Sequence, residues 1–355
     1  MKKRRNYLTR IFVLLIFTFS FVGCSKQNNI IFNKFTEIIS QKIIQNIEFD
    51  DKQDESIKIE KNSYVSYNGW LSIDNNTLVN QYMEKILLKG MSSHGIQWFP
   101  EFVNDNNIKL LKDWGANVFR IAMYTDEGGY LSNSDLKYKV YEMVDLVISN
   151  DMYVIIDWHI LHDNNPLYNL ESSKQFFAEV SKKYKDTPNV IYEICNEPNG
   201  NTTWNDVYSY ANEIIKVIRE NSKNSIIIVG TPTWSQDIDK VIDQPIDDPL
   251  VMYALHFYAG THKEDLRNRL KNVVGKIPIF VSEFGVTDAS GYGNIDLNEA
   301  RIWLDFLEEN NISWINWSLS NKAEGASFLN PNASYEIKDE YLSTSGKFIK
   351  EMLLR

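Results

Sequence analysis

Cysteine is nearly absent from this sequence, and its scarcity limits what can hold the fold together. The 355 residues include two cysteines, Cys24 and Cys195. Unless Cys24 stays a free thiol, the mature chain has no intramolecular disulfide, which excludes a small disulfide-stapled scaffold. A chain of this length can bury a core large enough to fold without cross-links. Cys195 directly precedes Asn196 and Glu197, so a nucleophilic thiol is one interpretation; a small buried apolar residue in a strand is the better one.

Basic residues are also in short supply. The chain has 37 basic and 47 acidic residues, and five of the basic ones precede Cys24, where no acidic residue occurs. Without that segment, 32 basic against 47 acidic residues leave a net charge of −15. Such a chain repels a phosphate backbone, so we expect no nucleic-acid partner, whereas a neutral polysaccharide is indifferent to this charge.

Metal-binding motifs are missing as well. The sequence has no HExxH motif and no Cys/His cluster; its nearest approach is the i, i+3 pair His159 and His162. A hydrolytic zinc site needs three protein ligands, so we expect no metal and no cofactor. We interpret His94, His159 and His256 as neutral side chains that bind hydroxyl groups and orient carboxylates. His162 and His262 are interpreted as loop residues.

The longest apolar run near the N-terminus is too short to span a membrane comfortably. Ile11–Val22 follows a basic start, and residues 1–24 therefore resemble an export signal. The signal ends in Phe-Val-Gly-Cys, similar to the lipobox of bacterial lipoproteins, which predicts lipidation of Cys24. Phe21 stands where an aliphatic residue is usual, so an ordinary signal peptide or an uncleaved anchor is the alternative.

Residues 25–62 are rich in Asn, Lys, Gln, Asp and Ile and lack a complete strand pattern. We interpret them as a flexible spacer, with a small helix packed on the next domain as the alternative. The expected location is the cell surface, with membrane contact through the N-terminal lipid anchor only, or a secreted form if the spacer is clipped. We expect a monomer.

From residue 63 to residue 355, short β-branched runs alternate with segments of helical period. The predicted strands are Ile86–Met91, Asn117–Met123, Tyr153–Trp158, Val190–Asn196, Ile226–Gly230, Val251–Phe257, Pro278–Glu283 and Ser313–Ser318. The predicted helices are Asn104–Trp114, Ser134–Ser149, Ser172–Tyr184, Tyr208–Glu220, Gln236–Ile242, Glu264–Val274 and Leu297–Glu309. This count predicts an α/β fold, the (β/α)8 TIM barrel. Leu71–Leu88, with its Asn75-Asn76 turn, predicts a β-hairpin at the barrel bottom.

Two glutamates carry the functional prediction. Glu197 and Glu283 each close a strand-like run and precede a breaker, Pro198 or Gly285. Both are expected at the C-terminal ends of barrel strands, where TIM barrels keep their chemistry. Two carboxyl groups that face one cleft are the pair of catalytic groups that cleavage of a glycosidic bond requires.

Polar and aromatic residues gather at the other predicted strand ends and support this interpretation. Arg120 is the expected partner of an ionised Glu283, and Tyr258 could donate to the same carboxylate. Glu197, with a raised pKa, would serve as acid and then as base, and Asn196 could bind the sugar's 2-hydroxyl. Glu193 lies on the same side of its strand as Glu197 but deeper, and no chemistry is assigned to it.

Tryptophan is plentiful, with nine residues. Trp98, Trp234 and Trp317 fall in loops or at strand ends and are the expected stacking platforms for sugar rings. Trp114 and Trp303 fall inside predicted helices and are expected in the core.

Six long stretches carry a likeness to a known family: Lys89–Trp98, Val118–Thr125, Tyr153–His159, Val190–Gly200, Met252–Gly260 and Trp314–Ser320. They resemble the bacterial endoglucanases of glycoside hydrolase family 5, particularly the Bacillus-type cellulases. The likeness runs from about Tyr64 to the C-terminus. The resemblance implies retaining endo-hydrolysis of β-1,4-glucan, with Glu197 as acid/base and Glu283 as nucleophile.

The same resemblance assigns the surrounding residues. It places His94, Arg120, His159, Asn196, His256, Tyr258 and Trp317 around the cleavage point. It implies that Trp98, Trp234, Lys322 and Glu324 contact the sugar. Tyr124 directly follows the predicted strand Asn117–Met123 and is expected to bind substrate as well. Phe284 departs from the family, which usually has Trp there, and Ala323–Lys338 follows it more loosely. Mixed-linkage glucan, xylan, mannan or xyloglucan as substrate, and a surface lipoprotein that binds glycans without cutting them, are the alternatives.

Overall fold

The structure is a computed structural model that describes residues 63–355. The predicted signal peptide, the spacer and Cys24 lie outside the described residues.

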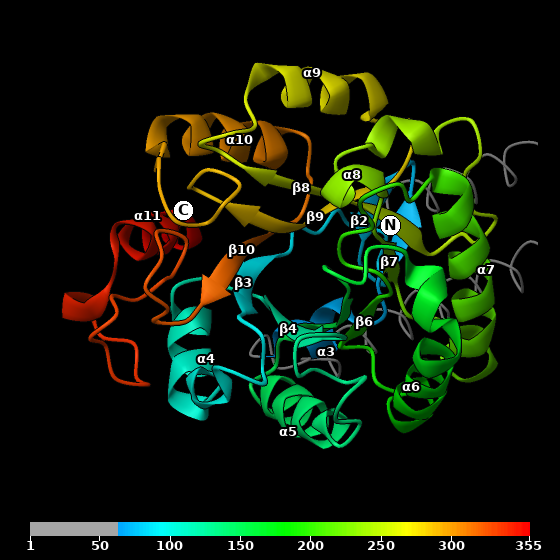
Figure 1. Cartoon of the computed structure of the whole chain (residues 1–355), viewed down its shortest axis with the longest axis horizontal. Helices are drawn as coiled ribbons and strands as arrows, with labels where there is room; N and C mark the ends of the chain where they lie inside the picture. Colours follow the sequence, from blue (N-terminus) through cyan, green and yellow to red (C-terminus); the bar gives the residue numbers. More distant parts are fainter. Residues whose placement is uncertain (1–62) are drawn as a thin grey trace, which may run out of the picture. The chain divides into compact units, whose positions relative to one another are not determined.

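Eight parallel strands close into a barrel in the order β10-β3-β4-β5-β6-β7-β8-β9 (Figure 1). The strands are β3 (Lys89–Ser93), β4 (Val118–Tyr124), β5 (Tyr153–His159), β6 (Val190–Glu193), β7 (Ile227–Val229), β8 (Val251–Tyr258), β9 (Ile279–Gly285) and β10 (Trp314–Leu319). The predicted (β/α)8 fold is therefore confirmed. Because the strands are parallel, all their C-terminal ends lie on the same side of the barrel, together with the loops that follow them.

Helices surround the strands as an outer ring (Figure 1). They are α4 (Asp105–Asp113), α5 (Leu136–Ser149), α6 (Leu170–Lys183), α7 (Trp204–Asn221), α9 (Glu264–Val273), α10 (Leu297–Glu309) and α11 (Thr344–Leu354). The four-residue turn α8 (Pro232–Ser235) follows β7 and lies inside this ring. Single 3-10 turns occupy Pro100–Phe102, Pro166–Asn169, Ile238–Val241 and Asp339–Tyr341. The helix α11 was not predicted; it lies beside α10, where Arg301 pairs with Glu351 at 3.1 Å.

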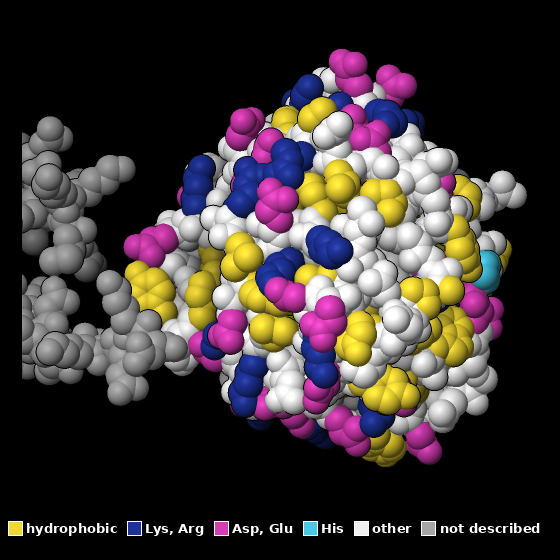
Figure 2. Space-filling model, turned by 90° about the vertical axis from the view of Figure 1, so that its left-hand side faces the viewer, with side chains coloured by type: hydrophobic (Ala, Val, Ile, Leu, Met, Phe, Trp, Pro, Cys, Tyr) yellow, Lys and Arg dark blue, Asp and Glu magenta, His cyan; other side chains and the backbone are white. Residues whose placement is uncertain are grey.

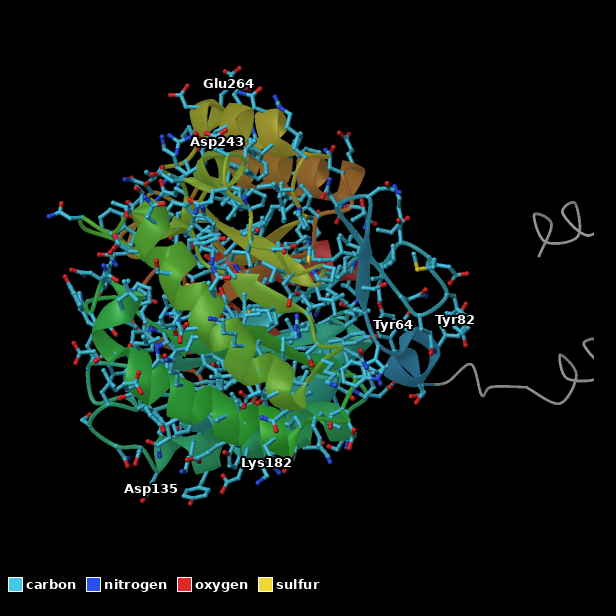
Figure 3. All side chains as sticks on the ribbon, turned by 90° about the vertical axis from the view of Figure 1, so that its right-hand side faces the viewer. Tyr64, Tyr82, Asp135, Lys182, Asp243 and Glu264 are labelled. Carbon is cyan, nitrogen blue, oxygen red and sulfur yellow. The ribbon has the colours of Figure 1, made fainter. Side chains whose placement is uncertain are left out.

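The apolar core has two main layers. The larger one lies between strands and helices and includes Trp303 and Trp114, as predicted. The smaller one fills the barrel and includes Leu71 and Leu78 from the segment around the hairpin. That hairpin consists of β1 (Ser72–Asp74) and β2 (Thr77–Val79) and follows the short helix α3 (Tyr64–Asn68). It closes the end of the barrel where the strands begin, as predicted; Figure 3 labels Tyr64 and Tyr82 there.

The fourth barrel strand is shorter than predicted. β6 ends at Glu193, so Glu197 lies four residues beyond it and does not end a strand. The next residues turn toward both neighbouring strands: Asn196 N–H donates to Trp158 O at 3.3 Å. A Cβ at Gly230 would lie 1.8 Å from Cys195 O, so only glycine permits this close approach.

The predicted helix Gln236–Ile242 is wrong. The turn α8 precedes it and a single 3-10 turn covers Ile238–Val241. Thr233, Trp234 and Ser235 all have left-handed backbone angles, with φ of 57°, 53° and 56°. Non-glycine residues rarely adopt this conformation, so three in succession mark a site where surrounding contacts impose the backbone path.

One side of the barrel's outer surface mixes charges of both signs. Figure 2 shows basic and acidic side chains interspersed with small apolar groups over the side that carries α4 and α11. Within residues 63–355, no helix combines the length and apolarity that a membrane crossing requires.

Candidate active site

Glu197 and Glu283 lie close together on the C-terminal side of the barrel, Glu197 four residues past β6 and Glu283 two residues before the end of β9. One carboxylate oxygen of each, together with a ring nitrogen of His256, fall within 4.8 Å of one another. Both side chains border a cavity of about 540 Å³. Glu197 and Glu283 are nevertheless buried, with 8% and 4% of their surface exposed, so each carboxyl group depends on protein partners.

Two donors hold the Glu283 carboxylate at the end of β9. Tyr258 Oη donates to Oε1 at 2.7 Å, and Arg120 Nη1 donates to Oε2 at 3.2 Å. Hydrogen bonds and an adjacent cation stabilise an ionised carboxylate, so this arrangement favours an anion at Glu283. Both contacts agree with the expectation from the sequence.

Arg120 organises the floor of the site from β4, where it is fully buried. Besides Glu283, its guanidinium contacts Glu193 through Nε at 2.7 Å and Asp157 through Nη2 at 3.0 Å. Nη2 also donates to Asn196 Oδ1 at 2.6 Å, which fixes the side-chain amide beside Glu197. Burial works against the charge of Arg120, but the neighbouring carboxylates outweigh it and raise its pKa.

Glu197 has the environment of a proton donor. Burial raises the pKa of its carboxyl group to about 7, opposed by its hydrogen bond to His256 and assisted by the charge of Glu283. Its Oε1 lies 2.9 Å from His256 Nδ1. A pKa near neutrality lets one group give and take a proton during a reaction.

His256 departs from the neutral state expected from the sequence. Burial alone would lower its pKa, but contacts with Glu193 and Glu197 outweigh burial and raise the pKa to about 9. Its second nitrogen, Nε2, lies 2.9 Å from Ser282 Oγ and 3.6 Å from Glu193 Oε1. The protonation of His256 could not be predicted from the sequence, because it depends on Glu193 in β6 and Glu197 beyond it, whose carboxyl groups reach the two different nitrogens of one ring.

The other two cleft histidines do have the character of neutral rings. Burial lowers the pKa of both His94 and His159 to about 3. His159 Nδ1 bonds to Asp157 Oδ2 at 2.6 Å, and its ring stacks on Trp317 at 5.2 Å. His94 packs against Trp317 as well, at a centroid distance of 5.1 Å.

The expected sugar contacts lie around the same cavity, with one exception. The cavity wall includes the predicted residues His94, Tyr124, His159, Trp234, Tyr258, Trp317, Lys322 and Glu324. Trp98 lies outside this wall, with 42% of its surface exposed, and packs edge-on against Tyr124 at 4.9 Å. Lys322 pairs with Glu324 at 2.7 Å, and burial raises the pKa of Glu324.

Other wall residues were not anticipated from the sequence. They are Leu161, Gln236, His262, Ala289, Ser290 and Gly291. Each lies in a loop after a barrel strand, which is the one sequence signal that could have suggested it. Asp157 and Ser282 were missed too, although a buried arginine in a strand calls for carboxylate partners.

The alternative nucleophile Cys195 is excluded by its position. It is fully buried, its Sγ faces Gly230 O at 3.9 Å, and burial raises its pKa. A thiol must be a thiolate and reach the substrate to act, and neither condition holds here.

Glu197, His256 and Glu283 are also a group that could hold a metal ion. Each of the three already has protein partners through hydrogen bonds, which suits proton transfer. Hydrogen-bonded carboxyl groups of this kind can serve as general acid, general base or nucleophile without an ion.

Comparison with known proteins agrees with a site that acts on a glycosidic bond. The profile of the family described as cellulase (glycosyl hydrolase family 5) matches residues 79–323. The chain is 49% identical over 294 residues to endoglucanase 5 of Pectobacterium carotovorum subsp. carotovorum, covering 81% of this chain and 58% of that protein. It is 50% identical over 278 residues to endoglucanase A of Evansella cellulosilytica, covering 76% and 57%. The chain thus spans somewhat less than three fifths of the length of these relatives.

A solved structure agrees with the fold. The catalytic domain of a Thermobifida fusca endoglucanase, in complex with cellotetraose, superposes with a TM-score of 0.80 at 34% identity. The match covers 82% of this chain and all of that domain. The barrel and the family profile converge, and the chain belongs to glycosyl hydrolase family 5.

Proposed function

We propose that this protein is an endo-β-1,4-glucanase that hydrolyses internal bonds with retention of configuration. Glu283 is the nucleophile and Glu197 the acid/base. The observation that carries the proposal is the approach of the two carboxylates to within 4.8 Å. Retaining enzymes separate their carboxyl groups by about 5–5.5 Å, whereas inverting enzymes need about 6.5–9.5 Å to admit a water molecule.

In the first step, the Glu283 carboxylate attacks the anomeric carbon while the glycosidic C–O bond breaks. Glu197 gives its proton to the departing oxygen, for which a pKa near 7 is suited. Arg120 and Tyr258 hold the attacking carboxylate in place. The products are a glycosyl ester on Glu283 and a free sugar chain end.

In the second step, Glu197 is ionised and acts as base. It takes a proton from a water molecule whose oxygen attacks the anomeric carbon, and the ester bond to Glu283 breaks. The Glu283 carboxylate is regenerated and Glu197 is again protonated. Two inversions at one carbon give net retention.

β-1,4-Glucan is the proposed substrate because of the cleft and the relatives. Trp234 and Trp317 offer aromatic surface for pyranose rings, while Lys322 and Glu324 offer hydrogen bonds to hydroxyl groups. Endoglucanases form the named relatives, and the Thermobifida fusca domain holds cellotetraose. Substrate selectivity among β-glycans depends on these same wall contacts.

Two assays test the function together. Carboxymethylcellulose should lose viscosity quickly and yield reducing ends, while xylan and mannan yield few. Glu283→Ala should abolish turnover, and azide should restore it on an activated glucoside with inverted product. Hydrolysis retained in Glu283→Ala would reject the nucleophile assignment.

The alternatives correspond to other outcomes. A higher rate on mixed-linkage glucan, xylan, mannan or xyloglucan would keep the mechanism and change the substrate. Tight oligosaccharide binding without new reducing ends would favour a glycan-capturing surface protein, although such a protein has no need for the paired glutamates.

We further propose that the protein is an exported, monomeric lipoprotein anchored through Cys24. The basic start, the apolar run and the Phe-Val-Gly-Cys ending support this. Labelling with a fatty-acid analogue should mark the wild-type chain and not Cys24→Ser. Equal labelling of both would reject lipidation at this cysteine.

A further inference from the structure

A continuous chain of contacts links the two proposed catalytic carboxylates beneath the cleft. Glu197 Oε1 lies 2.9 Å from His256 Nδ1, and His256 Nε2 lies 2.9 Å from Ser282 Oγ. Ser282 Oγ donates to Glu193 Oε1 at 2.6 Å. Glu193 Oε2 accepts from Arg120 Nε at 2.7 Å, and Arg120 Nη1 reaches Glu283.

The number of protons on each group determines which group donates and which accepts in this series of hydrogen bonds. Glu193, paired with Arg120, is a carboxylate, and a carboxylate only accepts hydrogen bonds. The single hydroxyl proton of Ser282 must therefore point to Glu193. Ser282 Oγ can then only accept from His256, so His256 Nε2 carries a proton.

This leaves His256 Nδ1 to share a proton with Glu197. If Nδ1 is also protonated, His256 is a cation that stabilises ionised Glu197. If Nδ1 is bare, Glu197 is protonated and donates to it. The negative charge of Glu193, 3.6 Å from Nε2, favours the cationic ring.

We propose that Glu193 and Ser282 are positioning residues that fix the Nε2–H form of His256 and so control the proton carried by Glu197. The inference depends on the proposed function only for the role of Glu197. Neither Glu193 nor Ser282 borders the cleft, and both are fully buried, so they act through His256 and not on the sugar.

The decisive variant is Glu193→Gln. The Gln oxygen must face Arg120, a donor, so its amide N–H₂ faces Ser282. Ser282 would then donate to His256 Nε2, and a neutral ring would carry its proton on Nδ1. Both the tautomer and the charge of His256 should change.

The measurement is ¹⁵N NMR of the histidine side chains in the full-length protein, recorded without substrate over a pH series. In the wild type, His256 should be doubly protonated at pH 7. In Glu193→Gln its titration midpoint should fall by about 1–3 pH units, the range for loss of a nearby opposite charge. The basic limb of kcat/KM should move to higher pH, because a neutral His256 no longer stabilises ionised Glu197.

Asp157→Asn is the matched control. Asp157 is also fully buried and contacts Arg120, at 3.0 Å, but its other partner is His159. The control also removes a carboxyl partner of the guanidinium, but burial raises the pKa of Asp157 and Asp157 does not contact Ser282 or His256. It should therefore move the His256 midpoint clearly less than Glu193→Gln does.

Ser282→Ala provides a second, smaller perturbation if Glu193→Gln does not fold. It removes the bridging hydroxyl but leaves the charge of Glu193, so a smaller fall in the midpoint is expected. An unchanged tautomer and midpoint of His256 in the variants that fold would overturn the inference. Since these spectra need no substrate, failure of the inference and failure to hydrolyse glucan are separate outcomes.

Discussion

Removal of the Arg120 guanidinium should destabilise the protein in a strongly pH-dependent way. In Arg120→Met, the carboxylates of Glu193 and Glu283 lose their shared cation while they remain buried. At least one of them must then take up a proton to stay in the folded protein. Its folded-state pKa rises above its value in the unfolded chain, so stability falls as pH rises between those two values.

The magnitude follows from the cost of that proton. An unfolded glutamate has a pKa of about 4.3, and one pH unit corresponds to about 1.36 kcal/mol. Holding one such carboxyl group neutral therefore costs about 4 kcal/mol at pH 7 and about 1 kcal/mol at pH 5. At about 2–4 °C per kcal/mol, Tm should fall by about 8–16 °C at pH 7 and by about 2–4 °C at pH 5.

Thermal unfolding followed by circular dichroism checks this, with Arg219→Met as control. Arg219 donates hydrogen bonds to a single carboxylate, that of Asp248, from Nε at 2.8 Å and from Nη2 at 2.9 Å. Both side chains are partly exposed. Water can solvate the freed Asp248, which stays ionised in both states from pH 5 to pH 7. The control should lose about 1–3 kcal/mol at either pH. An Arg120→Met loss that is equal at pH 5 and pH 7 would refute the reasoning.

Three further outcomes are expected. Because Glu197 must be protonated to act as acid and its pKa is about 7, kcat/KM should fall about tenfold per pH unit above about pH 7; a flat profile to pH 9 would contradict this. Trp234→Ala should raise KM for cello-oligosaccharides about tenfold with little change in kcat, because a stacking surface is worth about 1.5 kcal/mol; an equal effect on kcat would argue against a binding role. Phe284→Trp should overpack the contact with Phe257, at 5.1 Å, and cost about 1–3 kcal/mol in urea denaturation without moving the pH profile; a stabilised variant would show unfilled space there.

Topology made much of the site predictable. Tyr258 ends β8 and Glu283 lies near the end of β9, and a closed parallel barrel brings all its strand ends together whatever the exact register. Arg120 lies inside β4 and reaches the same side of the barrel with its long side chain. The role of Glu193 was out of reach, because strand parity gave its side of the sheet but not its contact with Arg120. That contact depends on the relative heights of β4 and β6 in the barrel, which cannot be predicted from the residues of either strand alone.

Boundaries were less predictable where backbone contacts override the local pattern. The run Val190–Asn196 has strand composition throughout, yet β6 stops at Glu193, although Ile194 N–H still donates to Ile228 O and Asn196 N–H to Trp158 O on the two neighbouring strands. The helix α11 carried a usable signal that was missed: Phe348, Ile349, Met352 and Leu353 recur at helical spacing and are buried.

The left-handed turn after β7 also ties the cleft rim to the proton donor. Ser235 Oγ donates to Asn196 O at 2.7 Å, and Trp234 N–H donates to Pro198 O at 3.0 Å. Two consecutive residues of this turn thus hold the backbone carbonyls on either side of Glu197. Substitutions in this turn should therefore shift the position of the Glu197 carboxyl group while every strand and its pairing stay intact.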